Sequence, residues 1–288
     1  MYYALQFEPH WIEVTKHDVK FENFSENLPQ LTIVQMSDFH AGNKMSESQI
    51  RQAAAIANSL SPDVIVLTGD FVHNKPEAAE PCARALSGLK AKYGIFAVLG
   101  NHDYSVGSAP PTVALKNQGF KILKNNNIKI AGNVWLIGID DFSSGWPDPA
   151  AAFSGVPSGA VRVVISHNPK IFPKIKDNNC FLIAAHTHGG QVDVPFIPRN
   201  YLPGLLSYDY VRGWYYEGNS RMYVNRGIGM VMPPMRFRCR PEIALFTLSR
   251  GTPEKYANPY AHKRPGPEAR RHFAIIYMAM RAWFKDKW

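Results

Sequence analysis

Cysteine is scarce in this chain. Three cysteines are present among 288 residues, at Cys82, Cys180 and Cys239. An odd number of widely spaced cysteines argues against a disulfide framework, and the lack of a Cys-x-x-Cys pair gives no support to a zinc ribbon. This usage is typical of a reducing compartment, and we expect all three to serve as small apolar side chains.

Long apolar runs are also missing. No uncharged apolar segment reaches the roughly 18 residues that span a bilayer, and the opening MYYALQFEPHWIEV lacks the basic and apolar regions of a signal peptide. We therefore expect a protein that is soluble or bound peripherally to a membrane.

Acidic residues are outnumbered by basic ones. The chain has 32 Lys and Arg against 23 Asp and Glu, a net charge of +9. Residues 251–288 hold eight Lys or Arg and three Asp or Glu, so this segment alone carries +5. Such an excess indicates an anionic partner, which leaves phosphates, nucleic acid and an acidic membrane surface open.

Short apolar runs alternate with helical patterns, which predicts an α/β fold. Residues 120–123 and 128–131 further predict a hairpin that turns at Asn125–Asn127. Residues 1–249 are expected to form one domain, followed by a Pro-, Gly- and charge-rich linker over 250–271. The predicted strands are Leu31–Met36, Val64–Thr68, Ile95–Leu99, Val134–Ile139, Val161–Ile165 and Phe181–Ala185, and the predicted helices are Ser46–Leu60 and Glu77–Leu89.

Polar clusters follow five of the predicted strands. Ligands of open α/β sheets bind at the carboxyl ends of strands, so these clusters should meet at one rim. Asp38 with His40, and His186 with His188, stand two residues apart, and on an extended backbone each pair points to one side. The clusters are Asp38-Phe39-His40, Gly69-Asp70, Gly100-Asn101-His102-Asp103, Ser166-His167-Asn168 and Ala185-His186-Thr187-His188-Gly189-Gly190-Gln191.

One such residue after a strand usually serves a turn, but the whole set suffices for two divalent metal ions that share an aspartate. Mixed nitrogen and oxygen ligands suit Mn, Fe or Zn and disfavour Ca²⁺. His73, three residues after Asp70, could reach the metal rim, and we interpret it as a loop residue or as one that supports the ligands. Asp140 and Asp141 end another strand, and we interpret them as turn residues.

These motifs, in this order over about 150 residues, resemble the calcineurin-like metallophosphoesterases. The likeness covers roughly residues 8–249 and implies a four-layer αββα sandwich of two mixed sheets flanked by helices. It also implies hydrolysis of a phosphoester by a hydroxide that bridges two metals. One departure is Ala185, where the family usually has Gly.

The resemblance further implies a role for each motif residue. His102 would face the substrate and assist the leaving oxygen, and Asp103 would orient His102. Asp70 would bridge the two ions. The first metal would be held by Asp38, His40, Asp70 and His188, and the second by Asp70, Asn101, His167 and His186.

A finer resemblance is to membrane-associated phosphodiesterases, some of which hydrolyse UDP-2,3-diacylglucosamine in lipid A synthesis. It implies a lipid- or nucleotide-linked phosphoester as substrate and a cytoplasmic location on the inner face of the cell membrane. Arg226 is the first candidate to bind a second phosphate. The likeness rests on His186–Gln191, Arg226–Gly229, Pro241–Ile243 and Pro9–Thr15.

Two sequence features favour an amphiphilic substrate independently. The aromatic segment Val194–Tyr216 has a composition suited either to an acyl-chain cleft or to its own small core. Residues 272–288 place apolar side chains at helical spacing among Lys and Arg, which predicts an amphipathic helix for a membrane interface, although such a helix can equally dock on its own domain.

Two alternatives remain at this stage. A soluble cyclic-nucleotide phosphodiesterase or a nuclease is compatible with the positive charge, although nucleic acid is not the expected partner because much of the excess lies in the tail. An inactive scaffold that keeps the fold is the remote alternative, since all seven expected ligands and His102 are present.

Overall fold

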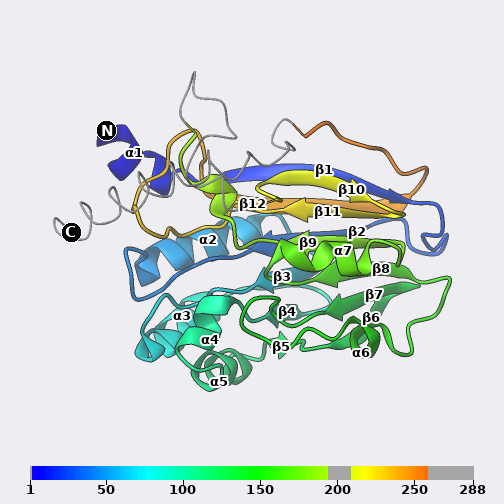
Figure 1. The fold of residues 1–288 in the computed structure, drawn as a ribbon, viewed down its shortest axis with the longest axis horizontal. Helices are drawn as coiled ribbons and strands as arrows, with labels where there is room; N and C mark the ends of the chain where they lie inside the picture. The colour runs from blue at the N-terminus through cyan, green and yellow to red at the C-terminus, as the bar shows by residue number, and fades with distance from the viewer. Residues whose placement is uncertain (1, 194–208, 259–288) are drawn as a thin grey trace, which may run out of the picture.

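A computed structural model describes residues 2–193 and 209–258 (Figure 1). Twelve strands in this part of the chain form two mixed sheets of six. The first sheet has the order β1 (Glu13–Phe21), β12 (Glu242–Arg250), β2 (Leu31–Met36), β3 (Val64–Thr68), β4 (Ile95–Val98) and β5 (Lys121–Ile122). The second has the order β10 (Gly213–Glu217), β11 (Ser220–Val224), β9 (Cys180–Ala184), β8 (Val161–Ile165), β7 (Val134–Gly138) and β6 (Asn126–Ala131).

Helices cover the outer faces of both sheets, which confirms the predicted αββα sandwich (Figure 1). One apolar cluster joins α2 and α3 to the first sheet, another joins α6 and α7 to the second, and a third fills the space between the sheets. The helices are α1 (Tyr2–Gln6), α2 (Glu47–Ser59), α3 (Ala79–Leu86), α4 (Asn101–Ser105), α5 (Ala109–Asn117), α6 (Pro149–Phe153) and α7 (Phe172–Ile175). None of these described helices is long and apolar enough to cross a bilayer.

Local chemistry explains where the longest helix begins. The Ser46 side chain accepts from the backbone N–H of Gln49, and the Gln49 side chain accepts from the backbone N–H of Ser46. This reciprocal capping box satisfies N–H groups that the first turn of a helix leaves unpaired. Helix α2 then buries Ile50, Ala53 and Ala57 against the first sheet.

The predicted hairpin at Asn125–Asn127 is wrong. β5 pairs with β4 in the first sheet, whereas β6 pairs with β7 in the second, so the chain crosses between sheets at this point. Asn125 holds the crossover, because its side-chain oxygen accepts from the backbone N–H groups of Asp140 and Asp148 at 3.0 Å. Apolar alternation identifies strands but does not choose their partners.

The described part of the aromatic segment, residues 209–216, packs into the protein. Tyr210, Trp214 and Tyr215 are buried, and the Trp214 ring stacks on Phe181 with centroids 5.4 Å apart. These residues therefore build core, not an acyl-chain cleft. Residues 194–208 and the predicted tail helix over 272–288 lie outside the described residues.

The beginning of the expected linker contacts the domain. The Tyr256 hydroxyl donates to the backbone oxygen of Asp18, and the Asn258 amide donates to the backbone oxygens of Arg212 and Trp214. The three cysteines are free and buried, as their number and spacing predict.

Candidate metal centre

The predicted polar clusters come together at one end of the sandwich. They follow the carboxyl ends of β2, β3, β4, β8 and β9 and surround an open pocket of about 430 Å³. The pocket is lined by Asp70, His73, Asn74, Asn101, His102, Ser105, His186, His188, Val231 and Met232.

Six of the seven expected ligands form two groups around this pocket. Asp38, His40 and His188 place one potential ligand atom each within 4.8 Å of one another, and Asp70, His167 and His186 do the same. The seventh, Asn101, brings its side-chain oxygen to 3.2 Å from His167 Nε2.

Asp70 connects the two groups. Its Oδ2 atom lies 3.2 Å from His167 Nε2 and 3.5 Å from His40 Nε2. A carboxylate in this position faces both groups at once, as a bridging ligand requires.

The backbone at these residues differs from the extended geometry assumed from the sequence. Asp38, His40, Asp70, His186 and His188 all have positive φ, between 48° and 75°. His186 and His188 consequently point into different groups instead of sharing one. Left-handed conformations of non-glycine residues cost free energy and concentrate at functional sites, which is where they occur in this chain.

Glycines allow backbone and ligands to approach closely. A Cβ atom on Gly100 would lie 2.2 Å from Asp70 Oδ1, and one on Gly227, where φ is +71°, would lie 2.7 Å from the Cβ of Asp38. Neither position has room for a side chain. Ala185 is not among the described residues with positive φ, so its methyl group is compatible with the local backbone.

Burial keeps several of the imidazoles neutral. It lowers the pKa of His40 and of His188 well below the usual value and lowers that of His186 to about 3. A neutral imidazole presents a lone pair, which is the form that binds a metal. Burial would raise the pKa of Asp70, but the charge and the hydrogen bond of His167, together with the other nearby imidazoles, outweigh it and hold that pKa well below the usual range.

The donor set fits divalent cations. Oδ1 of Asp38 is buried without a hydrogen-bond partner, and Nε2 of His40 faces Nε2 of His188 at 3.0 Å. His167 is oriented for ligation, because its Nδ1 donates to the backbone oxygen of Thr68 at 2.8 Å and leaves Nε2 toward Asp70. A buried cluster this polar is costly without cations or hydrogen bonds to satisfy it.

His102 lies beside the groups and lines the pocket. Its backbone N–H donates to Asp70 Oδ1 at 2.9 Å, and its ring Nδ1 donates to the backbone oxygen of His73 at 2.7 Å.

Asp103 differs from the expectation. Its buried carboxylate accepts from the backbone N–H groups of Asp70 and Gly100 through Oδ2, and of Phe71 and Val72 through Oδ1. Through these four hydrogen bonds the Asp103 carboxylate holds the backbone of the loop that carries Asp70. The His102 ring is oriented instead by the hydrogen bond that its Nδ1 donates to the backbone oxygen of His73.

His73 lies beside the candidate ligands, within the reach that its place in the sequence allows. Its Nδ1 lies 3.2 Å from His40 Nδ1, and its ring stacks on His102 with centroids 4.9 Å apart. With His40 and His102 it forms a third group able to surround an ion. Its position three residues after Asp70 was the one signal for it. Asp141, by contrast, accepts from the backbone N–H groups of Ser143 and Ser144, as a turn residue does.

Arg226 lies behind the His186–Gln191 loop. Its Nε donates to Glu242 at 3.1 Å and its Nη2 to Glu13 at 2.9 Å. A Cβ on Gly189 would lie 2.6 Å from the Arg226 stem, so the arginine packs directly under that loop. Two carboxylates thus engage the guanidinium, and its contact with a substrate phosphate stays a prediction.

Comparison with known proteins gives one family. The sequence profile of the calcineurin-like phosphoesterases matches residues 31–192. The chain is 31% identical to the uncharacterized metallophosphoesterase YkuE of Bacillus subtilis, over 85% of this chain and 88% of YkuE. It is 30% identical to phosphodiesterase YaeI of Escherichia coli (84% and 90% covered) and 28% identical to the UDP-2,3-diacylglucosamine pyrophosphatase LpxG of Chlamydia trachomatis (84% and 91%).

Proposed function

The chain belongs to the calcineurin-like phosphoesterase family, whose members are metal-dependent phosphoric ester hydrolases, and we propose that it cleaves a phosphodiester or pyrophosphate bond of a lipid-linked substrate at a membrane surface. The observation that carries this proposal is the pair of His/Asp groups joined by Asp70 beside a pocket that His102 lines. UDP-2,3-diacylglucosamine, an intermediate of lipid A synthesis, is the proposed substrate.

The proposed ligands are those of the two groups. Asp38, His40, Asp70 and His188 would hold one divalent ion, and Asp70, Asn101, His167 and His186 the other. Mn²⁺ is the first candidate, with Fe and Zn²⁺ as the others that suit this donor set. When bound, such ions neutralise phosphoryl charge and lower the pKa of water.

His102 is the proposed catalytic residue of the protein itself. The His73 oxygen holds a proton on Nδ1, which leaves Nε2 as the ring atom able to face a substrate. When the ring carries a second proton on Nε2, His102 can contact the phosphoryl group and give that proton to the leaving oxygen, which returns the ring to the neutral form with its proton on Nδ1. Asp103 contributes indirectly, because its carboxylate positions the backbone around Asp70.

The lipid substrate is supported by the similarity to LpxG, a UDP-2,3-diacylglucosamine pyrophosphatase. Membrane contact is supported by the N-terminal aromatic patch, which we define as Tyr2, Tyr3, Phe7 and Trp11. These side chains are exposed, Tyr2 to 71% and Trp11 to 55%. Tyrosine and tryptophan favour the interface between water and lipid. We place the protein on the cytoplasmic face of the cell membrane.

The patch is anchored next to the pocket. The backbone N–H of Arg236 donates to the oxygen of Ala4 at 2.9 Å, and Gln191, beside the candidate ligands, accepts from the backbone N–H of Val231 in the same loop. Val231 and Met232 line the pocket. A membrane at the patch would therefore lie near the entrance through which a lipid-linked substrate arrives.

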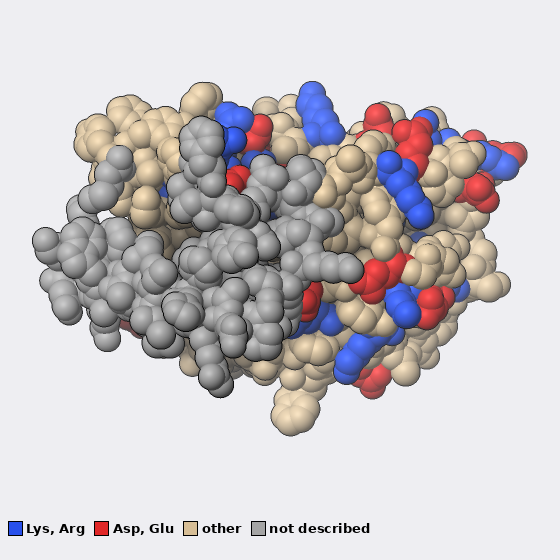
Figure 2. Space-filling view, turned by 45° about the horizontal axis from the view of Figure 1, so that its top comes forward, with Lys and Arg blue, Asp and Glu red and all other residues tan. Residues whose placement is uncertain are grey.

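A nuclease would need a basic stripe beside the site. On the part of the face in Figure 2 that the grey atoms leave visible, the described Lys and Arg side chains lie among Asp and Glu. The described residues that line the metal-site pocket include no Lys or Arg, so we favour the lipid-linked substrate over nucleic acid.

One panel of assays tests the proposal. Hydrolysis of UDP-2,3-diacylglucosamine, a cyclic nucleotide and single-stranded DNA is measured in parallel with the Mn²⁺-loaded protein. The His102→Ala variant, purified and loaded in the same way, is the control. We expect hydrolysis of the first substrate, abolished by the substitution. Turnover of the cyclic nucleotide or DNA alone would overturn the lipid-linked substrate, and no turnover of any would favour the inactive scaffold.

A further inference from the structure

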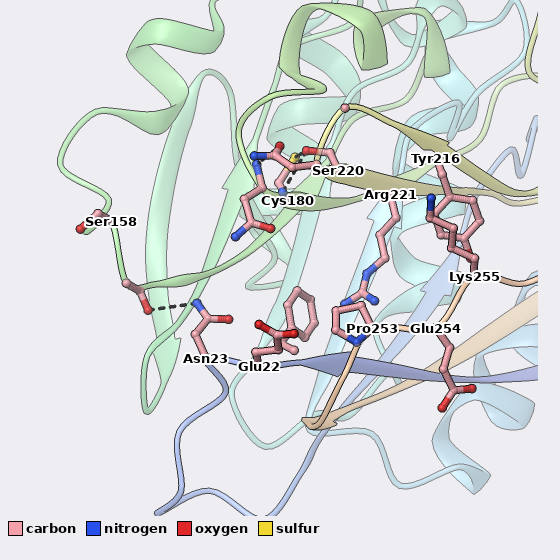
Figure 3. A pocket seen from close by; sticks show the side chains of 15 residues that line it. Glu22, Asn23, Ser158, Cys180, Tyr216, Ser220, Arg221, Pro253, Glu254 and Lys255 are labelled. Carbon is pink, nitrogen blue, oxygen red and sulfur yellow. Dashed lines mark hydrogen bonds between the residues drawn. The ribbon is translucent and has the colours of Figure 1, made fainter.

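A second pocket, of about 470 Å³, opens at the opposite end of the sandwich (Figure 3). It lies where β9 and β11 begin and β1 ends, whereas the candidate metal centre lies where β9 ends. Cys180 lines this pocket and His186 lines the other, six residues apart or about 20 Å of extended chain. The two pockets are therefore separate sites.

The floor of this pocket holds a buried arginine. Arg221 is 8% exposed and projects from the middle of three paired strands, opposite Tyr216 on β10 and Phe181 on β9. Figure 3 shows its side chain reaching from β11 toward Pro253, into the space that the labelled residues surround. The guanidinium carbon lies 4.3 Å from the centroid of the Phe21 ring.

The charge of Arg221 has no carboxylate partner among the described residues. Its Nη2 donates a hydrogen bond to the backbone oxygen of Lys20, at 2.5 Å. Glu254, which also lines the pocket, pairs with Lys20 at 2.7 Å instead. Burial lowers the pKa of Arg221 to about 10, so the side chain still carries its charge at neutral pH. A buried guanidinium without an anion is costly, and it can offer further donors to a ligand.

The surroundings restrict which anion fits. A guanidinium matches the two oxygens of a carboxylate with two parallel hydrogen bonds. The exposed rim residues Glu22, Glu254 and Lys255 together carry one negative charge, which disfavours a dianion such as a phosphate monoester more than a monoanion. Phe21 and Tyr216 supply aromatic walls for a flat, apolar body.

We propose that this pocket binds a small planar monocarboxylate, held by Arg221 and stacked between aromatic side chains. The site is separate from the hydrolase centre and does not depend on which phosphoester that centre cleaves. Its test is a direct binding measurement on the metal-loaded protein.

The probe is benzoate, measured by calorimetric titration, with benzamide as its neutral counterpart and inorganic phosphate as the dianion. We expect saturable binding of benzoate, with benzamide weaker by about tenfold to a hundredfold, the worth of one or two charge-assisted hydrogen bonds. Phosphate should still bind when Arg221 is changed, because any phosphate binding belongs to the metal centre.

Two variants complete the test. Arg221→Met should abolish benzoate binding, whereas Arg250→Met, which removes an exposed arginine paired with Glu26, should leave it unchanged. Arg221→Lys keeps the positive charge but loses the two parallel N–H donors of the guanidinium, so it should bind benzoate more weakly than the native protein. Absence of benzoate binding by the native protein, or equal binding by Arg221→Met, would show that Arg221 only anchors β11 to β1.

Discussion

The ring of His102 is held by the backbone of His73, with Nδ1 2.7 Å from the His73 oxygen. A backbone acceptor fixes the tautomer of the ring without adding a negative charge to the pocket. The role expected of the Asp103 side chain is thus filled by a carbonyl group, while Asp103 holds the backbone from Asp70 to Val72.

The first prediction concerns His102. His102→Ala should lower kcat by about 10²–10⁴-fold, the usual contribution of a general acid or base, and should leave the bound metal unchanged. Elemental analysis alongside steady-state kinetics measures both quantities. Asp70→Ala is the comparison, because it removes the carboxylate that faces both groups and should lose metal as well as activity. Loss of both metals in His102→Ala would mean that His102 is itself a ligand.

Much of the fold and of the site could be predicted from sequence. The strands Leu31–Met36, Val64–Thr68 and Val161–Ile165 have the predicted bounds, because buried strands are short apolar runs that end at polar residues. The candidate ligands lie together because their motifs follow strands of both sheets whose carboxyl ends lie at the same end of the sandwich.

The parts that could not be predicted depend on partners distant in sequence. The parallel pairing of β1 with β12 joins residues more than two hundred positions apart, and no local pattern encodes it. The group that orients His102 is the backbone oxygen of His73. Because every residue type has such an oxygen, the sequence does not indicate which residue accepts this hydrogen bond. Likewise, the positive φ of the candidate ligands follows from the loops that hold them and not from their side chains.

The second prediction concerns metal content. The donor set predicts two metal ions per chain, and gently purified protein should approach that ratio by elemental analysis. Removal of metal with EDTA should abolish hydrolysis, and Mn²⁺ should restore it. Full activity in the chelated protein would contradict the proposed centre.

The third prediction concerns the contact between Gly100 and Asp70. In Gly100→Ala the new methyl group would lie 2.2 Å from Asp70 Oδ1, so Asp70 or the loop must move. We expect a loss of about 1–3 kcal/mol in the free energy of unfolding, together with weaker metal binding. Gly88→Ala is the matched control, since nothing lies within 4 Å of its added Cβ, and it should behave as the native protein. Native metal affinity in Gly100→Ala would show that the site tolerates this displacement.

The fourth prediction concerns Glu242 and acid stability. Burial would raise the pKa of Glu242, but Arg226 and the hydroxyls of Thr15 and Tyr223 outweigh it and lower that pKa from 4.5 to about 2. Between these two values the unfolded chain binds more protons than the folded one. The stabilisation is therefore complete above about pH 4.5, is lost as the pH falls toward 2, and amounts to about 3 kcal/mol at most.

Urea unfolding of Glu242→Gln at a series of pH values measures this contribution. The variant should be less stable than the native protein at pH 7, and the difference should shrink as the pH falls through that window. Glu26→Gln, which alters an exposed ion pair with Arg250, is the control and should change stability little at any pH. A stability difference that does not vary with pH would mean that Glu242 acts through packing alone.

The last prediction concerns the N-terminal aromatic patch. If Phe7 and Trp11 enter a lipid interface, Phe7→Ser with Trp11→Ser should weaken sedimentation with phosphatidylglycerol vesicles by about tenfold or more, since each aromatic side chain contributes about 1.5–3 kcal/mol when fully buried. Neither residue lines the metal-site pocket, so metal content and hydrolysis of a small soluble diester should stay at native levels. Trp146→Ser removes an aromatic side chain that is 81% exposed in the segment between β7 and α6, and it serves as the control.

A chain that ends at Asn258 tests the basic tail separately, because Asn258 still makes its contacts with Arg212 and Trp214. Its binding to anionic vesicles should be weaker than that of the full chain and less sensitive to salt, because the excess charge of the tail is screened over about 10 Å at 0.1 M. Equal vesicle binding by the full chain, the aromatic variant and the shortened chain would refute membrane contact through either segment and would favour a soluble substrate.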